Sequence, residues 1–140
     1  MKATTVDWKD RRWLAQRFAQ VVQWARAKNS KAPFLTALID CPRTLAQRRK
    51  GDKRAFMHVG HVPRRVCMAA EVCNLNPYYQ VGLMLHELGH PMAEKAWGRS
   101  EQEDADQAVK EFLGVEILYK GPLVLQAISH RDFRRICGVV

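Results

Sequence analysis

Residues Val81–His90 read VGLMLHELGH, and the rest of the chain is organised around this stretch. Its last five residues place histidines at positions 86 and 90, four residues apart. In a helix, residues i and i+4 share one face, so the imidazoles of His86 and His90 can bind one metal ion together. Glu87 comes directly after the first histidine and would lie beside that ion. The pattern therefore predicts a metal-binding helix with an acidic group at the metal.

The residues that precede this stretch fit the start of a helix that packs against a core. Asn76 can cap the helix and Pro77 suits its first turn. An apolar face then runs beside the histidines and consists of Val81, Leu85 and Leu88. Pro91 follows the motif at once, and a proline inside a helix removes a backbone hydrogen bond. We therefore expect the helix to end or kink at Pro91.

A second helix is expected shortly after the first. Residues 100–103 read Ser-Glu-Gln-Glu, which matches the capping box S-x-x-E, and Gly114 is a typical C-cap. The core face of this helix would consist of Ala105, Ala108, Val109 and Phe112. Its small alanines would allow a close approach to the motif helix.

Two histidines do not complete a catalytic zinc site, which usually has three protein ligands and a water. If the two helices form an antiparallel hairpin about Gly98, Asp106 comes level with His90. Asp106 is therefore the preferred third ligand. The other acidic candidates are Glu101, Glu103 and Asp104.

The remainder of the chain predicts a single α+β domain over residues 1–140. An amphipathic helix is expected from Asp7 to about Lys28, because its apolar residues recur with helical spacing. Strands are expected at 54–62, 64–72 and 115–119, and short helices at 42–50 and 123–130. Residues 32–40 fit either a strand or a helical turn, and 131–140 remain unassigned.

Composition indicates a globular protein without a membrane partner. Hydrophobic residues make up 47% of the chain and charged residues 26%, as in soluble domains. No apolar run approaches the length of a membrane span, and the first residues lack the apolar core of a signal peptide. We expect a cytoplasmic location. The four cysteines are expected to be thiols, with a Cys67–Cys73 disulfide as the open alternative.

Positive charge is concentrated in the first part of the chain. Residues 1–80 contain 16 Lys and Arg against 5 Asp and Glu, whereas residues 81–140 contain 7 against 9. Such asymmetry suggests an anionic partner such as nucleic acid, although a solvated basic surface is an equal alternative. The densest basic run is the candidate phosphate-contacting loop and contains Arg48, Arg49, Lys50, Lys53 and Arg54.

The segment 54–120 resembles zincin metallopeptidases, specifically the gluzincin-like set and the compact HELGH peptidases of phages and mobile elements. In that set an HELGH helix precedes a helix with E-x-x-x-D, which often ends in Ala-Asp, as Ala105-Asp106 does here. Gln102 stands where the family has its ligand glutamate. The resemblance implies a zincin-like α+β fold. Its small, mostly antiparallel sheet would pack on the N-terminal and motif helices, and a ligand-bearing helix would follow.

The resemblance also implies a zinc-dependent metallopeptidase that hydrolyses peptide bonds of a protein or peptide substrate. One Zn²⁺ per chain would be held by His86, His90 and Asp106, with Glu87 as general base. Because Gln102 departs from the family, Asp106 either ligates the metal instead of orienting His86 or leaves that role to a neighbouring acid. Two alternatives stay open: a Spartan-like protease recruited to nucleic acid by the basic residues, and an inactive zincin-like metal-binding module.

Overall fold

The computed structural model describes residues 11–30, 32, 37–40, 57–59, 65–68, 70–121 and 124–138. Two groups of short strands lie between helical segments along these residues. In chain order the elements are α1 (Arg11–Lys28), β1 (Ala37–Asp40), β2 (Met57–Val59), β3 (Arg65–Met68), the 3₁₀ helix η1 (Ala70–Asn74), α3 (Pro77–Trp97), α4 (Gln102–Ala108), the π-helical turn η2 (Val109–Leu113), β4 (Leu118–Lys120), β5 (Leu125–Ala127) and α5 (His130–Cys137).

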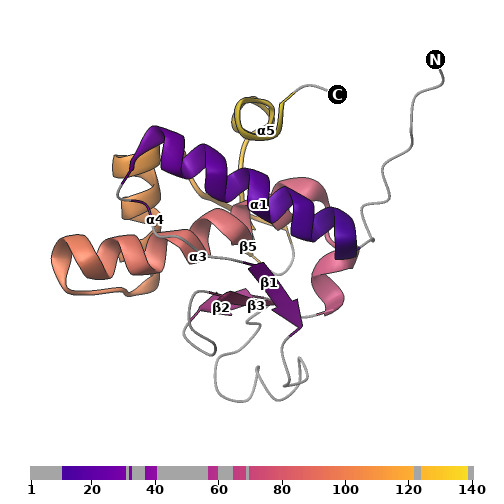
Figure 1. The fold of residues 1–140 in the computed structure, drawn as a ribbon, viewed down its shortest axis with the longest axis horizontal. Coiled ribbons are helices and arrows are strands. Elements are labelled where there is room, and N and C mark those ends of the chain that lie inside the picture. The colour runs from indigo at the N-terminus through magenta and orange to yellow at the C-terminus, as the bar shows by residue number, and fades with distance from the viewer. Residues whose placement is uncertain are drawn as a thin grey trace.

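Helix α3 lies at the centre of the described structure (Figure 1). It packs against α1 on one side and against α4, β5 and β2 elsewhere. Helix α1 in turn contacts β1 and α5. Every residue from Gln80 to Gly89 in α3 is buried, so the motif helix forms part of the core and is not a surface helix.

The strands form two small sheets. In the first, β3 pairs in parallel with β1 and antiparallel with β2, and in the second β4 pairs antiparallel with β5. The α+β class expected from the sequence is confirmed, and two of the three pairings among the described strands are antiparallel. Strands β2 and β3 lie within the expected strands at 54–62 and 64–72. Residues 70–72 belong instead to η1, so the strand expectation is wrong there, and the expected strand at 115–119 is shifted, because only 118–120 form β4.

The start of α3 agrees with the sequence, but its end does not. The Asn76 side chain accepts a hydrogen bond of 2.8 Å from the Tyr78 amide, and Pro77 occupies the first turn. Of the two outcomes expected at Pro91, an end or a kink, the first is wrong, because the helix continues through Pro91 to Trp97. Met92 and Ala93 extend its buried face beyond the proline, and burying them favours continuation despite the missing backbone hydrogen bond.

The cap of α4 differs from the expected capping box by one residue. The helix begins at Gln102, and the Asp104 carboxylate accepts a 3.0 Å hydrogen bond from the Glu101 amide. The Ser100 hydroxyl instead donates to the His90 carbonyl, at 3.0 Å. Gly114 ends η2 in the left-handed region, with φ of 70°, as expected of a C-cap.

The expected helix at 123–130 is wrong, because residues 125–127 form β5. Leu125 and Ala127 are buried and Gln126 between them is half-buried, which is the two-residue period of a strand. Helix α5 begins only after Ser129, whose side chain accepts a 3.1 Å hydrogen bond from the Asp132 amide.

Several expectations concern other parts of the chain. The Asp7 cap, the helix at 42–50 and the basic run at 48–54 lie outside the described residues. Cys73 is buried near the end of η1. Among the described helices, none combines the length and apolar character that a bilayer crossing requires.

Candidate metal centre

The site depends on an unusually close contact between α3 and α4. A Cβ atom built on Gly89 would lie 2.2 Å from the Ala105 carbonyl oxygen, so only a glycine fits there without a shift of backbone. Ala105 and Ala108 are fully buried on the facing side of α4, as the sequence led us to expect. This backbone contact brings the side chains of the first turns of α4 onto the histidines of α3.

The two histidines direct one nitrogen each at the same oxygen atom. Nε2 of His86 lies 2.6 Å from Oε1 of Gln102, and Nε2 of His90 lies 3.1 Å from that oxygen. The ring centroids are 4.8 Å apart and the planes are nearly perpendicular. His86 is only 2% exposed, and His90 is half-buried. Two imidazole nitrogens therefore converge on one amide oxygen.

The other nitrogen of each ring faces an acceptor from α4 or the residues before it. Nδ1 of His86 lies 2.6 Å from Oδ1 of Asp106. Nδ1 of His90 lies 2.8 Å from Oγ and 3.1 Å from the carbonyl oxygen of Ser100. Because carboxylate and carbonyl oxygens only accept, Nδ1 carries the proton on both rings. In the neutral form of each ring, Nε2 then presents its lone pair to Gln102.

This donor set fits a metal ion. Two nitrogen lone pairs and an oxygen lone pair that face one another repel, unless a cation or a proton lies among them. Imidazole nitrogen and amide oxygen are both ligands of divalent metals, and Nδ1–H bonds to a carboxylate or carbonyl are the usual support of metal-binding histidines. His86, Glu87 and His90 also have ligand atoms that all lie within 4.8 Å of one another.

Glu87 contributes a buried acidic group to the centre. Its side chain is 4% exposed, and its negative charge acts on the neighbouring imidazole. Burial by itself lowers the pKa of His86, but the hydrogen bond with Asp106 and the charges of Glu87 and Asp106 outweigh it, so the pKa is raised. Burial and the adjacent His86 lower the pKa of His90. Without a metal ion, His86 therefore takes up a second proton, on Nε2, more readily than His90 does.

Asp106 is itself held by a residue from the second sheet. The Tyr119 hydroxyl, on β4, donates a 2.5 Å hydrogen bond to Oδ2 of Asp106. Burial, followed by this bond to a carboxylate, raises the pKa of Tyr119, so the phenol stays protonated and keeps donating. Both oxygens of Asp106 are thereby engaged, one by His86 and one by Tyr119.

The acidic candidates from the sequence have different positions. Asp106 contacts Nδ1 of His86, whereas Nε2 is the nitrogen that faces Gln102. Asp104 pairs with Arg99 at 2.9 Å and accepts from the Glu101 amide, which holds the pKa of its carboxyl below the usual value. Glu101 and Glu103 are exposed. Of the four, the structure brings only Asp106 to the histidines.

Sequence reasoning missed three members of the centre: Ser100, Gln102 and Tyr119. Gln102 lies four residues before Asp106, where the E-x-x-x-D pattern described above has its ligand glutamate. This spacing is the sequence signal that could have identified Gln102. Ser100 was assigned to a cap. Tyr119 carried no signal, because it reaches Asp106 only through the packing of a separate hairpin.

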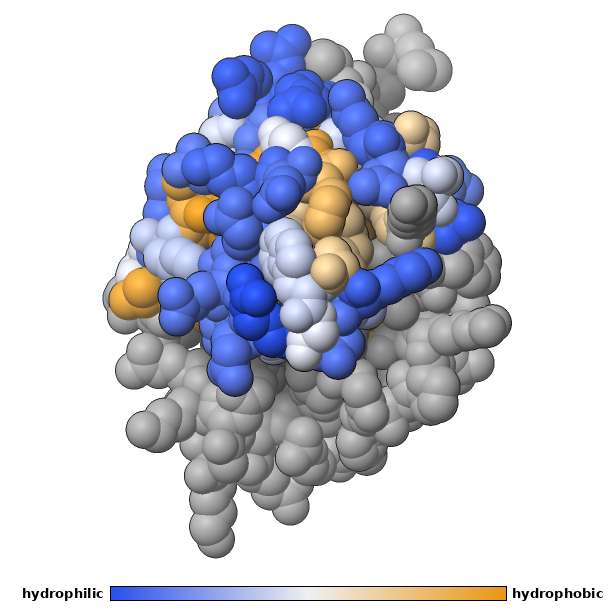
Figure 2. All heavy atoms as spheres, turned by 90° about the vertical axis from the view of Figure 1, so that its left-hand side faces the viewer, coloured by the Kyte–Doolittle hydropathy of each residue, from blue (hydrophilic) through white to orange (hydrophobic). Residues whose placement is uncertain are grey.

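A cleft of about 430 Å³ adjoins the centre. Gln102, Asp106 and Tyr119 line it together with Lys110, Glu103 and Glu116. The end of the molecule where α3 finishes and α4 packs is mainly hydrophilic, with small hydrophobic spots (Figure 2). The cleft adjoins the centre at Gln102 and Asp106, and neither histidine nor Glu87 lines it.

No family model, curated protein or solved structure matches the chain.

Proposed function

We propose that the chain is a zinc-dependent metallopeptidase of zincin type that hydrolyses peptide bonds of a protein or peptide substrate. The observation that carries the proposal is the convergence of Nε2 of His86 and Nε2 of His90 on Oε1 of Gln102, at 2.6 and 3.1 Å. The buried Glu87 carboxylate lies in the same group and has the place of a general base in the H-E-x-x-H pattern.

Zinc would be held by His86, His90 and the amide oxygen of Gln102. This assignment replaces Asp106, the third ligand preferred from the sequence, because Asp106 contacts the opposite nitrogen of His86. Asp106 instead fixes the tautomer and the orientation of that ring, and Ser100 does the same for His90. Three protein ligands leave one position of a tetrahedral ion open, as a catalytic site requires.

The protein groups divide the chemistry as follows. The chemistry that zinc supplies when bound is Lewis acidity, which polarises a carbonyl and makes water acidic near neutral pH. The Glu87 carboxylate accepts the proton of the attacking water and donates it to the leaving amine nitrogen. Glu87 is itself buried, so bulk water screens its charge only weakly.

The test combines metal analysis with release of peptides from an unfolded, fluorescently labelled protein. We expect about one zinc per wild-type chain and its loss in His86→Ala. Glu87→Gln should retain zinc and lose about 10²- to 10⁴-fold of the activity, the usual contribution of a general base. Equal peptide release by wild type and Glu87→Gln would contradict the peptidase function.

The third ligand is tested separately by zinc titration. Gln102→Ala should abolish tight binding, whereas Asp106→Asn should weaken zinc binding by about 10- to 100-fold, as loss of an orienting partner does. Glu103→Gln, an exposed acidic residue on the same helix, is the matched control and should bind zinc like wild type. Full zinc retention in Gln102→Ala together with zinc loss in Asp106→Asn would instead make Asp106 the ligand.

The neutral ligand also favours a second candidate, a zincin-like module that binds metal without hydrolysis. An amide contributes no negative charge, so Gln102 binds zinc less strongly than the glutamate of the resembling family would. A module of this kind would bind zinc in both wild type and Glu87→Gln and release no peptide from either. Wild-type hydrolysis that depends on Glu87 excludes it.

A further inference from the structure

Two basic helices pack side by side on a part of the molecule that the metal centre does not use. Helix α1 contains five basic residues and no acidic residue, and helix α5 contains three arginines and one aspartate. The two helices contact each other (Figure 1). The aspartate, Asp132, is buried and lies 2.7 Å from Arg135 and 3.7 Å from Arg131, so it offsets one of the three arginine charges of α5.

Aromatic rings of α1 fix several of these cations in place. The Arg17 guanidinium lies 4.8 Å from the centroid of the Trp13 ring and donates to the Cys137 carbonyl of α5 at 3.2 Å. Trp24 has Lys28 at 5.7 Å and Arg135 at 5.8 Å from its ring centroid. Cations held against rings lose less side-chain entropy when they bind an anion.

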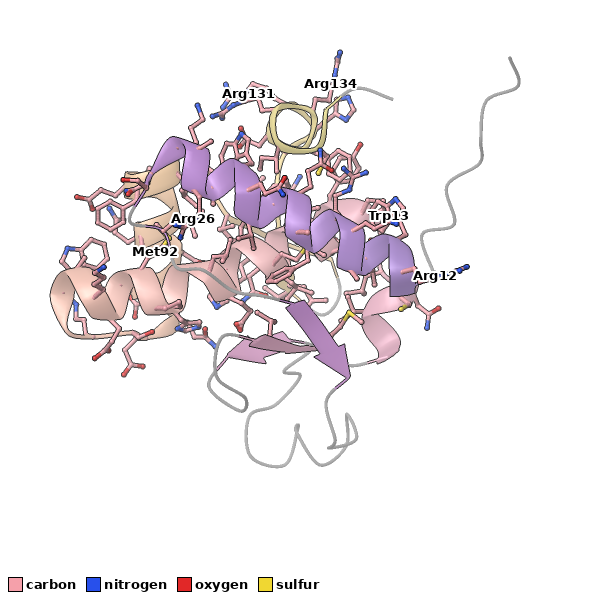
Figure 3. The ribbon with its side chains drawn as sticks, viewed as in Figure 1. Arg12, Trp13, Arg26, Met92, Arg131 and Arg134 are labelled. Carbon is pink, nitrogen blue, oxygen red and sulfur yellow. The ribbon has the colours of Figure 1, made fainter. Side chains whose placement is uncertain are left out.

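Two further arginines extend this surface outward. Arg131 and Arg134 lie on the side of α5 that faces away from α1 (Figure 3), and the Arg131 side chain is 81% exposed. We call the surface formed by Arg17, Lys28, Arg131, Arg134 and Arg135 the α1–α5 basic face. By contrast, residues 70–121, which contain the metal centre, have nine acidic and four basic residues. Within residues 11–30, 70–121 and 124–138, positive charge is thus concentrated on the two helices.

We propose that the α1–α5 basic face binds the phosphate backbone of nucleic acid, without sequence specificity. Four of its five cations are arginines, whose planar fork matches phosphate oxygens. The apolar sides of α1 and α5 are buried in the core, and the large exposed hydrophobics among the described residues are Tyr119 and Val124, on neither helix. A helix that enters a membrane surface needs an exposed apolar face, so a bilayer is the poorer partner. None of its five residues belongs to the basic run at 48–54.

The test measures fluorescence anisotropy of a labelled 20-base-pair DNA duplex at salt concentrations from 50 to 200 mM. Wild type should bind and weaken steeply with salt. Arg131→Ala/Arg134→Ala should bind about tenfold more weakly at 50 mM salt. Its plot of log affinity against log salt should be shallower by roughly 2, because each lost phosphate contact removes about 0.9 from the slope. Arg131→Lys/Arg134→Lys should keep the wild-type slope.

Matched variants separate a local face from overall charge. Lys95→Ala/Lys120→Ala removes the same charge from exposed positions on α3 and β4 and should bind DNA within about twofold of wild type. Equal loss in this control, or wild-type binding by Arg131→Ala/Arg134→Ala, overturns the proposal. So does loss of binding confined to Arg48→Ala/Arg49→Ala.

Two competing partners complete the experiment. Binding of wild type to phosphatidylserine vesicles but not to the duplex, with loss in Arg131→Ala/Arg134→Ala, would assign the face to a membrane surface. Stronger displacement of the duplex by polyglutamate than by unlabelled DNA at equal charge would assign it to an acidic protein. Displacement by unlabelled DNA at the lower concentration supports nucleic acid. Unchanged circular dichroism and melting temperature establish that each variant is folded.

Discussion

Replacing Gly89 by alanine tests whether backbone contact between α3 and α4 sets the geometry of the metal centre. In a helix without neighbours this change would stabilise the protein by up to about 1 kcal/mol, because alanine has the higher helix propensity. Here the new methyl would lie 2.2 Å from the Ala105 carbonyl oxygen. The helices must separate by about 1 Å to accommodate it, and overpacking of this kind costs about 1–3 kcal/mol or more.

We therefore expect Gly89→Ala to lower the free energy of unfolding by about 2 kcal/mol, which for a domain of this size lowers the melting temperature by roughly 6–8 °C. Urea denaturation and thermal melts measure both quantities. Zinc affinity should fall as well, because Gln102 and Asp106 move with α4. Gly98→Ala is the control. A Cβ at this position meets nothing within 4 Å, so any loss of stability reflects only the left-handed backbone, with φ of 70°. A melting temperature of Gly89→Ala at or above wild type would refute the reasoning.

Three further changes have defined outcomes. Tyr119→Phe should weaken zinc binding by about threefold to tenfold, because it removes the 2.5 Å hydrogen bond that holds Asp106 against His86. Titration calorimetry measures the affinity, and an unchanged value would show that Tyr119 does not help to position Asp106. Pro91→Ala should raise the urea midpoint by an amount equivalent to about 1–3 kcal/mol, since it restores a backbone N–H within α3. A lower midpoint would show that the proline stabilises the folded protein at this position. Burial disfavours the thiolate of Cys137 in the folded protein and so raises the pKa of this thiol. The folded protein therefore keeps its full stability below about pH 8.5, the usual thiol pKa, and loses stability as the pH rises from there through the higher folded pKa. Urea midpoints from pH 7 to 10 should therefore fall more for wild type than for Cys137→Ala, and parallel curves would contradict this.

Local signals in the sequence were enough to locate the motif helix and its start. Asn76 and Pro77 act through their immediate neighbours, and the periodic apolar residues of α1 and α3 are buried as their spacing indicates. The errors arose where tertiary packing decides. Burial of Met92 and Ala93 carries α3 past Pro91, and packing of β5 on α3 makes a strand of residues 125–127.

The residues of the candidate centre likewise form two groups, one predicted by local sequence and one that depends on tertiary packing. The histidines and Glu87 come from one helix, so their spacing alone brings them together. The groups that complete the centre come from the start of α4 and from β4, and their positions depend on how closely those elements approach α3. A single helical turn separates Gln102 from Asp106, and that turn determines which of them faces Nε2 and which faces Nδ1.

Gly82, His86 and Gly89 occupy one face of α3, at positions i, i+4 and i+7. A Cβ on Gly82 would lie 2.6 Å from Cα of Ala127 in β5, just as one on Gly89 would meet α4. His86 therefore lies between two positions at which the backbone of α3 contacts the backbone of a neighbouring element: β5 at Gly82 and α4 at Gly89. Side chains adapt to substitution by changing rotamer, but contacts of this kind have no such freedom. The dimensions of the centre should therefore survive repacking of the side chains that α1 contributes to the core, yet respond to a single methyl group at either glycine.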